Sequence, residues 1–368
     1  FLLTIFNYSV SAQETTSNIF GSVKTSEGRP VSGAKVEVND TRTGASSSSS
    51  SGASGSFSIT NLRVGGPYEV TVTSPSGNRK VSDVYLSLGQ TFNLPVTLQV
   101  GSVDEVVVTA SQALAADVAT GPSQVYSLTD LQNLPAINRD IKDVLRTDPR
   151  IHLDISNADD VQCAGSSPRF NSFTVDGVRL NDGFGLNSNG YPTERMPFSY
   201  DAIEQVAVEL APFDVQYGGF YACNIHAVTK GGTNEFHGGF FYDYTDDNFR
   251  GDSLDGDSVA VPAFERKRYG FNVGGPIVED KLFFFVAYEK LEDINTFERG
   301  PEGSGAINEV AGFTQDEYDR IVNIARNQYQ YEPGGTPLGL DVEDEKILLK
   351  LDANINDQHR ASFTYIYN

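Results

Sequence analysis

Hydrophobic and polar residues alternate in short segments through the first hundred positions of the chain. Six such segments follow one another at the close spacing expected of a β-sandwich. The predicted strands are 19–23, 34–38, 57–59, 68–72, 81–86 and 92–98. Gly and Pro residues lie between them, where tight turns require their backbone angles. The serine run 46–51 is of low complexity and is predicted to form a flexible loop between two strands.

Helical spacing appears next, between positions 127 and 149. Ser127 and Asp130 have the spacing of a capping box, which predicts a helix start. Asn138 is predicted to cap a second helical turn. The residues predicted to share the buried face of that turn are Ile141, Val144 and Leu145.

Aromatic residues at alternate or nearly alternate positions dominate the chain beyond residue 234. This pattern predicts membrane-barrel strands with Tyr and Phe near their ends. The predicted strands are 236–244, 269–273, 282–288, 347–355 and 361–367. A closed membrane barrel needs at least about eight strands, so we expect an incomplete antiparallel barrel and a chain that is part of a longer polypeptide. A helix is predicted at 315–326 within the long segment between the third and fourth strands.

Composition and charge exclude some classes of function. The 368 residues carry a net charge of −22, and a nucleic-acid-binding surface would need clustered Lys and Arg. No HExxH, P-loop, GxSxG or dinucleotide-binding GxGxxG motif is present, so we predict no enzyme, no catalytic residue and no cofactor. Residues 1–12 are predicted to be the remnant of an export signal, with Val10-Ser11-Ala12 before the cleavage point; a core strand is the alternative for the apolar run 1–6.

Several short motifs carry a family resemblance. Gly21-Ser22-Val23, Gly55-Ser56-Phe57 and the strand at 68–72 make residues 19–100 resemble a carboxypeptidase-regulatory-like domain, which is an Ig-like β-sandwich without catalytic residues. Residues 111–232 resemble the α+β plug domain of TonB-dependent outer-membrane transporters. The motifs that carry this second resemblance are Val175-Asp176-Gly177-Val178, Ile203 to Glu209, Tyr217-Gly218-Gly219 and Val228 to Gly238. Together with residues 233–368, which resemble the first strands of the barrel, the arrangement is most similar to the Oar-like branch of that family.

The segment 103–110 lies directly before the predicted plug and resembles the TonB box of this family. The residues expected to bind TonB are Asp104, Glu105, Val106, Val107, Val108, Thr109 and Ala110. A short β-branched run of this kind can add as a strand to the exposed sheet edge of a partner. The alternative from sequence alone is that the run forms the last strand of the preceding sandwich.

The resemblance also implies a location and a mechanism. It places the barrel in outer-membrane lipid, with the sandwich and the TonB box in the periplasm. TonB, together with its inner-membrane energising complex, would remodel the plug to pass an unidentified extracellular substrate. Candidate substrate contacts at the plug apex are Asn181, Asp182, Asn187, Tyr191 and Arg195; the alternative is a plug loop packed on the barrel wall. An outer-membrane adhesin or surface-binding protein without transport is the rival function.

The two cysteines, Cys163 and Cys223, both fall within the predicted plug. In an exported protein such a pair commonly forms a disulfide, which we expect here. A metal pair is the alternative, but the four histidines at 152, 226, 237 and 359 show no ligand spacing around it. The acidic stretch 246–257 contains oxygen ligands suitable for Ca²⁺, but its spacing is not that of an EF-hand, and a solvated loop is the favoured interpretation.

Overall fold

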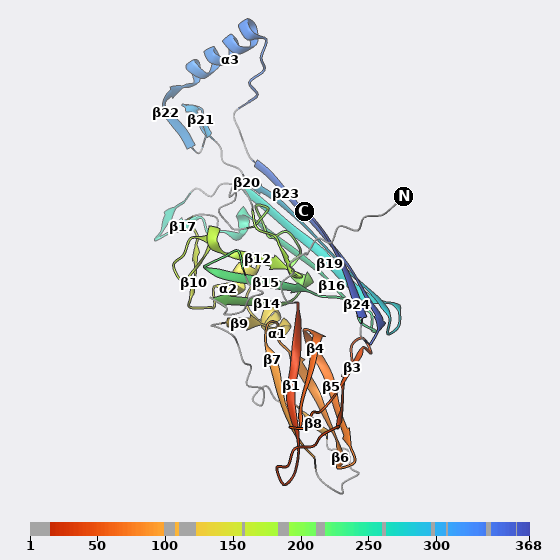
Figure 1. Ribbon diagram of the computed structural model, residues 1–368. Coiled ribbons are helices and arrows are strands. Elements are labelled where there is room, and N and C mark those ends of the chain that lie inside the picture. Colours follow the sequence, from red (N-terminus) through yellow and green to blue (C-terminus); the bar gives the residue numbers. More distant parts are fainter. Residues whose placement is uncertain are drawn as a thin grey trace, which may run out of the picture. The chain divides into compact units, whose positions relative to one another are not determined.

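A computed structural model describes eleven stretches of the chain, and mainly β structure is confirmed in them (Figure 1). The stretches are 15–98, 107–109, 123–156, 159–182, 191–210, 218–259, 263–295, 299–306, 308–335, 340–357 and 359–368. The predicted signal remnant 1–12 lies outside them. The chain forms two compact units, one of residues 1–238, 272–287 and 347–368, the other of residues 239–271 and 288–346.

The N-terminal sandwich consists of two sheets that enclose one apolar core. The three-stranded sheet has the order β4-β1-β7, and the five-stranded sheet has the order β3-β2-β5-β6-β8. The strands are β1 (Thr16–Thr25), β2 (Lys35–Asp40), β3 (Ser46–Ser50), β4 (Ser56–Arg63), β5 (Gly65–Ser74), β6 (Gly77–Leu86), β7 (Thr91–Leu98) and β8 (Val107–Thr109). Alternate residues of most of these strands are buried, as in β7, because side chains of a strand point to opposite faces. The six strands predicted from the sequence are confirmed.

The serine run departs from the prediction. Residues 46–50 form strand β3, which pairs antiparallel with β2 from Lys35↔Ser50 to Asn39↔Ser46. The pairing uses main-chain groups, so small polar side chains do not prevent it. Ser51 is also ordered, because its hydroxyl donates to Val31 O at 2.7 Å and accepts from Ala34 N at 2.9 Å. The flexible loop predicted for this run is therefore wrong.

The plug region, residues 123–229, is built on a five-stranded sheet of order β13-β12-β15-β14-β9 with short helices on it. Its elements are β9 (Ser123–Tyr126), α1 (Leu128–Asn133), α2 (Ile141–Leu145), β10 (Ile151–Asp154), β11 (Asp160–Cys163), η2 (Pro168–Phe170), β12 (Ser172–Val175), β13 (Val178–Arg179), η3 (Tyr200–Ala202), β14 (Ile203–Leu210) and β15 (Cys223–Thr229). The predicted capping box of Ser127 and Asp130 is confirmed. Asp140, not Asn138, caps α2, because its carboxylate accepts from Lys142 N; Asn138 instead donates its main-chain N–H to Asp143.

A third sheet, called here the wall sheet, has the order β16-β19-β20-β23-β24. Its strands are β16 (His237–Asp246), β19 (Phe264–Val278), β20 (Leu282–Asn295), β23 (Leu340–Asn356) and β24 (His359–Tyr367), so the five predicted strands are confirmed. In β24 the exposed rings of Phe363, Tyr365 and Tyr367 alternate with half-buried residues. An apolar face of this kind suits contact with lipid.

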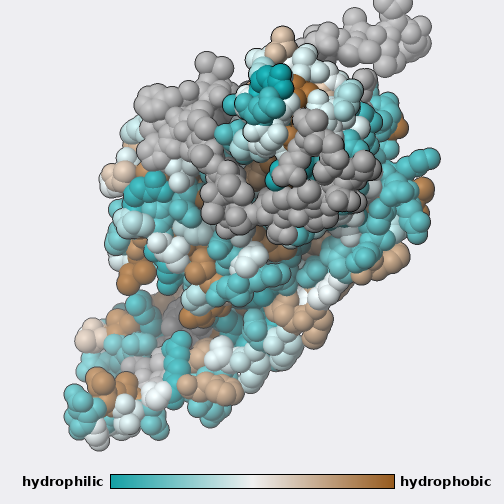
Figure 2. Space-filling view, turned by 90° about the horizontal axis from the view of Figure 1, so that it is seen from below, coloured by the Kyte–Doolittle hydropathy of each residue, from teal (hydrophilic) through white to brown (hydrophobic). Residues whose placement is uncertain are grey.

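The remaining elements belong to the segments between wall strands. They are η4 (Asp247–Phe249), β17 (Ser253–Leu254), β18 (Asp257–Ser258), β21 (Arg299–Glu302), β22 (Asn308–Thr314) and α3 (Gln315–Tyr329). Helix α3 confirms the predicted helix and begins at a capping box of Thr314 and Glu317. Among the residues coloured in Figure 2, hydrophilic and hydrophobic ones are interspersed, with the hydrophobic ones in small groups. Within the described ranges, no helix has both the length and the apolar character to cross a membrane.

We predict that Gly21→Ala destabilises the sandwich. A Cβ at this position would lie 2.2 Å from Leu94 O and 2.4 Å from the Phe57 ring, so both neighbouring strands would have to shift. Overpacking of this kind costs about 1–3 kcal/mol in the free energy of unfolding. Denaturant unfolding of the chain measures the loss. Gly52→Ala is the matched control, because a Cβ there would meet only Ser56 O at 3.7 Å; equal stability of the two variants would contradict the packing.

Candidate functional site

The predicted TonB-contact segment is described at three positions. Val107, Val108 and Thr109 form β8, which pairs in parallel with Lys80, Val81 and Ser82 of β6. Asp104, Glu105, Val106 and Ala110 lie outside the described residues. These three residues therefore form the last strand of the sandwich, which was the alternative left open by the sequence.

This pairing occupies only one side of the segment. Strand β8 ends the five-stranded sheet, so in the described part of the chain no strand lies on its outer edge. A sheet edge carries unpaired main-chain N–H and C=O groups that can accept a further strand. The pairing with β6 is thus compatible with strand addition by a partner.

The plug region contacts the wall sheet through a largely buried carboxylate, that of Asp176, whose side chain is 14% exposed. Asp176 and Gly177 form the hairpin turn between β12 and β13, both with positive φ, as the Asp-Gly prediction required. Asp176 Oδ2 accepts from Lys350 Nζ of β23 at 3.1 Å and from Thr364 Oγ1 of β24 at 3.0 Å. Lys350 Nζ also donates to Thr229 O at 3.1 Å, and Thr229 N donates to Asp176 Oδ1 at 2.9 Å. One carboxylate thus joins the hairpin, the end of β15 and the wall.

The ion pair decides the charge state of this carboxylate. Burial opposes ionisation, but Lys350 and the hydrogen bonds from Thr229 outweigh it and hold the pKa of Asp176 below its ordinary value. Removal of either partner would leave the other charge uncompensated in the interior, so the two side chains are held together. The contact therefore fixes where the plug hairpin lies on β23.

His226 of β15 is a second buried titratable group near this carboxylate. Its side chain is 1% exposed, and within the described residues its Nε2 has no hydrogen-bond partner. Burial lowers the pKa of His226 to about 4, an effect that the nearby Asp176 only partly offsets. The imidazole is therefore neutral at pH 7.

Among the candidate substrate contacts, Asn181 supports the plug fold. Its Oδ1 accepts from Phe173 N and from Arg179 Nε, each at 2.9 Å. Its Nδ2 donates to Asn171 O at 3.1 Å. The side-chain amide is therefore committed to neighbouring main-chain and side-chain groups.

The ring of Tyr191 belongs to the plug core. The side chain is 4% exposed, packs against Phe173 and donates its hydroxyl to Asp140 Oδ1 at 2.6 Å. Burial and the Asp140 carboxylate raise the pKa of Tyr191 well above its ordinary value. Asp182 and Arg195 are half-buried, and Asn187 lies outside the described residues.

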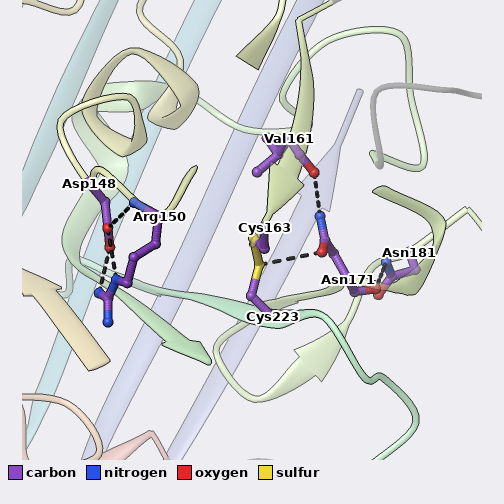
Figure 3. Close-up of a disulfide and its surroundings, with 7 residues drawn as sticks. All are labelled: Asp148, Arg150, Val161, Cys163, Asn171, Asn181 and Cys223. Atoms are coloured by element: carbon purple, nitrogen blue, oxygen red, sulfur yellow. Dashed lines mark hydrogen bonds and ion pairs between the residues drawn. A yellow bond between two sulfur atoms is a disulfide. The ribbon is translucent and has the colours of Figure 1, made fainter. Parts of the chain in front are cut away.

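Cys163 of β11 and Cys223 of β15 form a disulfide, as expected for the pair (Figure 3). Both cysteines are fully buried. Asn171 lies beside the bridge: its Nδ2 donates to Val161 O at 2.7 Å, and its Oδ1 is 3.4 Å from Cys223 Sγ. The bridge thus joins the small β10-β11 sheet to the plug sheet.

The acidic stretch 246–257 is used in local structure. Asp246 caps η4, and its carboxylate accepts from Asn248 N at 3.0 Å. Across the described ranges, no three His, Cys, Asp or Glu side chains gather as metal ligands would.

Three family models match successive parts of the chain. The Carboxypeptidase regulatory-like domain matches residues 18–99, the TonB-dependent Receptor Plug Domain residues 116–222, and the Outer membrane beta barrel domain residues 228–300. The resemblances to a carboxypeptidase-regulatory-like domain, a plug domain and an outer-membrane barrel are thereby confirmed.

Two curated relatives are a transporter and a receptor. The chain is 27% identical over 217 residues to the TonB-dependent transporter Oar of Myxococcus xanthus, covering 55% of this chain and 19% of that protein. It is 26% identical over 276 residues to the "Probable TonB-dependent siderophore receptor PirA" of Acinetobacter baumannii, covering 65% of this chain and 34% of that protein. The chain thus spans a fifth to a third of the length of these relatives.

Two solved structures are similar in part. The outer membrane transporter YddB from Escherichia coli has a TM-score of 0.46 at 15% identity, covering 67% of this chain and 33% of that chain. The siderophore receptor PirA from Acinetobacter baumannii has a TM-score of 0.45 at 21% identity, covering 67% of this chain and 31% of that chain.

We predict that acidification weakens the fold through His226. Its pKa is about 4 when folded and about 6.5 when unfolded, so the unfolded state alone takes up a proton between these values. The stability that neutral His226 permits is present above pH 6.5 and is lost as pH falls toward 4. Between pH 7 and pH 5 the loss is roughly 2 kcal/mol. The stability contributed by ionised Asp176, whose folded pKa is lowered, is lost only below about pH 4.

Denaturant midpoints of the chain at pH 7 and pH 5 measure this loss. His226→Gln is the control, because it removes the titration and keeps a polar side chain of similar size. An equal pH dependence in wild type and His226→Gln would show that His226 does not cause the loss of stability.

Proposed function

We propose that this chain, which belongs to the TonB-dependent outer-membrane receptors, takes part in active transport of a substrate across the outer membrane. TonB supplies the energy through contact with Asp104–Ala110, and the plug controls passage. The sandwich and the contact segment lie in the periplasm, where TonB can reach them.

We also propose the bounds of the domains that take part in this function. We assign residues 19–100 to the carboxypeptidase-regulatory-like sandwich, 103–110 to the TonB box, 111–232 to the plug and 233–368 to barrel strands and loops. The Cys163–Cys223 bridge lies wholly inside the assigned plug.

The observation that carries the proposal is the edge position of β8. Its outer edge is free of other strands in the described part of the chain, and its inner edge is held by only three residue pairs. A few main-chain hydrogen bonds, at roughly 0.5–1.5 kcal/mol net each, give a contact that is specific but reversible. A transporter that engages and releases TonB in each cycle needs such a contact.

The Asp176–Lys350 pair supports the role of the plug. The pair is intramolecular, largely buried and fully hydrogen-bonded, so it holds the plug hairpin on the wall at rest. Breaking it leaves two charges poorly solvated, which makes movement of the hairpin costly without an energy source. We propose that TonB supplies the energy for this movement.

The substrate is best sought first among ferric siderophores, because one curated relative is a probable siderophore receptor. In the 181–195 stretch, Asp182 and Arg195 remain the candidate contacts among the described residues, with Asn187 outside them. Asn181 and Tyr191 would act indirectly, by supporting the plug fold. Growth of a deletion strain on defined nutrient and iron sources would identify the substrate class.

We predict that deletion of Asp104–Ala110 abolishes uptake and leaves substrate binding at the cell surface unchanged, because binding does not use the periplasmic contact. Neighbouring residues of a strand direct their main-chain N–H groups to opposite edges. One of the two single variants Val107→Pro and Val108→Pro therefore removes a donor from the outer edge, and that variant should lower uptake at least tenfold.

Val108→Thr is the matched control for these variants, because it keeps the main-chain N–H and the β-branched shape. Radio-iron uptake and surface binding measure the two steps separately. Unchanged uptake after the deletion would contradict transport and favour the adhesin alternative.

A further inference from the structure

The strand that carries the TonB-contact residues is part of a larger sheet. Its pairing partner β6 is itself paired with β5 on the other side, and the sheet continues to β2 and β3. The three residues of β8 therefore extend a preformed sheet at its edge. A partner strand added there would find its neighbour already ordered.

Strand β6 is also attached to the plug. Gln205 of β14 is buried, and its side-chain amide makes two hydrogen bonds to the chain at the end of β6. Nε2 donates to Leu86 O at 3.0 Å, and Oε1 accepts from Leu88 N at 3.0 Å. One side chain thus satisfies a main-chain donor and a main-chain acceptor of the sandwich.

Apolar packing and Arg42 also join the sandwich to the plug. Leu88 lies in a buried cluster with residues from both domains, namely Val64, Ala207 and Val228. Arg42 donates to Val64 O at 3.2 Å, pairs with Asp40 at 2.9 Å and lies 3.5 Å from Glu204 Oε1 of the plug. The sandwich is therefore fixed to the plug by contacts resembling those inside a domain, and β6 has a defined position.

We propose that TonB extends the sandwich sheet: an extended segment of TonB adds to the outer edge of β8 while the inner edge of β8 stays paired with β6. This inference rests on the proposed function and specifies how TonB binds. The docking surface then includes the sandwich, which holds β8 in an extended conformation before TonB arrives. A strand ordered in advance loses less conformational entropy on binding than a free segment.

Addition at the outer edge is favoured over displacement of β8 from β6. Displacement must first break the three residue pairs with Lys80, Val81 and Ser82, whereas addition breaks none. A three-residue strand paired on one side is short, and a second pairing turns it into an interior strand. TonB binding should therefore strengthen the β6–β8 pairing.

Hydrogen exchange of the full chain with and without the periplasmic domain of TonB tests this directly. We expect amide exchange at Val107–Thr109 to slow by roughly threefold or more on TonB binding, with no acceleration at Lys80–Ser82. Faster exchange at Lys80–Ser82, or no slowing at Val107–Thr109, would overturn the inference. If TonB does not bind the chain at all, the proposed function fails along with it.

A cross-strand lock gives a second test. Ser82 and Thr109 are register partners on neighbouring strands, so Ser82→Cys and Thr109→Cys place two thiols opposite each other for disulfide formation. The oxidised variant should bind TonB within about twofold of wild type, whereas displacement predicts a loss of tenfold or more. Each single cysteine variant is a control. Failure of the pair to oxidise would show that β8 does not lie on β6 and would equally refute the inference.

Discussion

A strand that is paired along one side keeps main-chain donors and acceptors on its other side, and the proposed energy coupling depends on that property of β8. If both edges of Val107–Thr109 were paired within the chain, TonB would have no edge to share. If neither edge were paired, the segment would have no fixed place or conformation. The single pairing with β6 avoids both extremes. It presents an extended strand without committing all of its hydrogen-bonding groups.

Two polar contacts connect the sandwich to the plug and the plug to the wall sheet. Gln205 joins the end of β6 to the plug sheet, and Lys350 joins the plug hairpin to β23 through Asp176. Each is buried, and each pairs groups that would be costly to bury alone. Such contacts define one resting arrangement more sharply than apolar packing does. Breaking them costs free energy, which fits the proposal that plug movement needs an energy source.

The elements that depend on local pattern could be predicted from the sequence. Alternation predicted the sandwich and wall strands, and Asp176-Gly177 predicted its hairpin. Local rules failed where a competing group lay nearby: Asp140 caps α2 in place of Asn138, and β2 pairs with a serine run that composition assigns to a loop. Contacts between distant residues could not be predicted. Lys350 is 174 positions from Asp176, Gln205 is more than a hundred from Leu86, and neither has a local signature. The burial of Tyr191 depends in the same way on Asp140 and Phe173.

The most direct measurement is site-specific photo-cross-linking in living cells, with a cross-linker placed at each position from 104 to 110 in turn. Strand sharing predicts TonB adducts from within this segment and none from exposed sandwich positions away from it, such as Ser56 on β4. The adducts should disappear in cells that lack TonB. Absence of adducts at every position from 104 to 110, in a protein that still supports uptake, would contradict TonB contact at this strand.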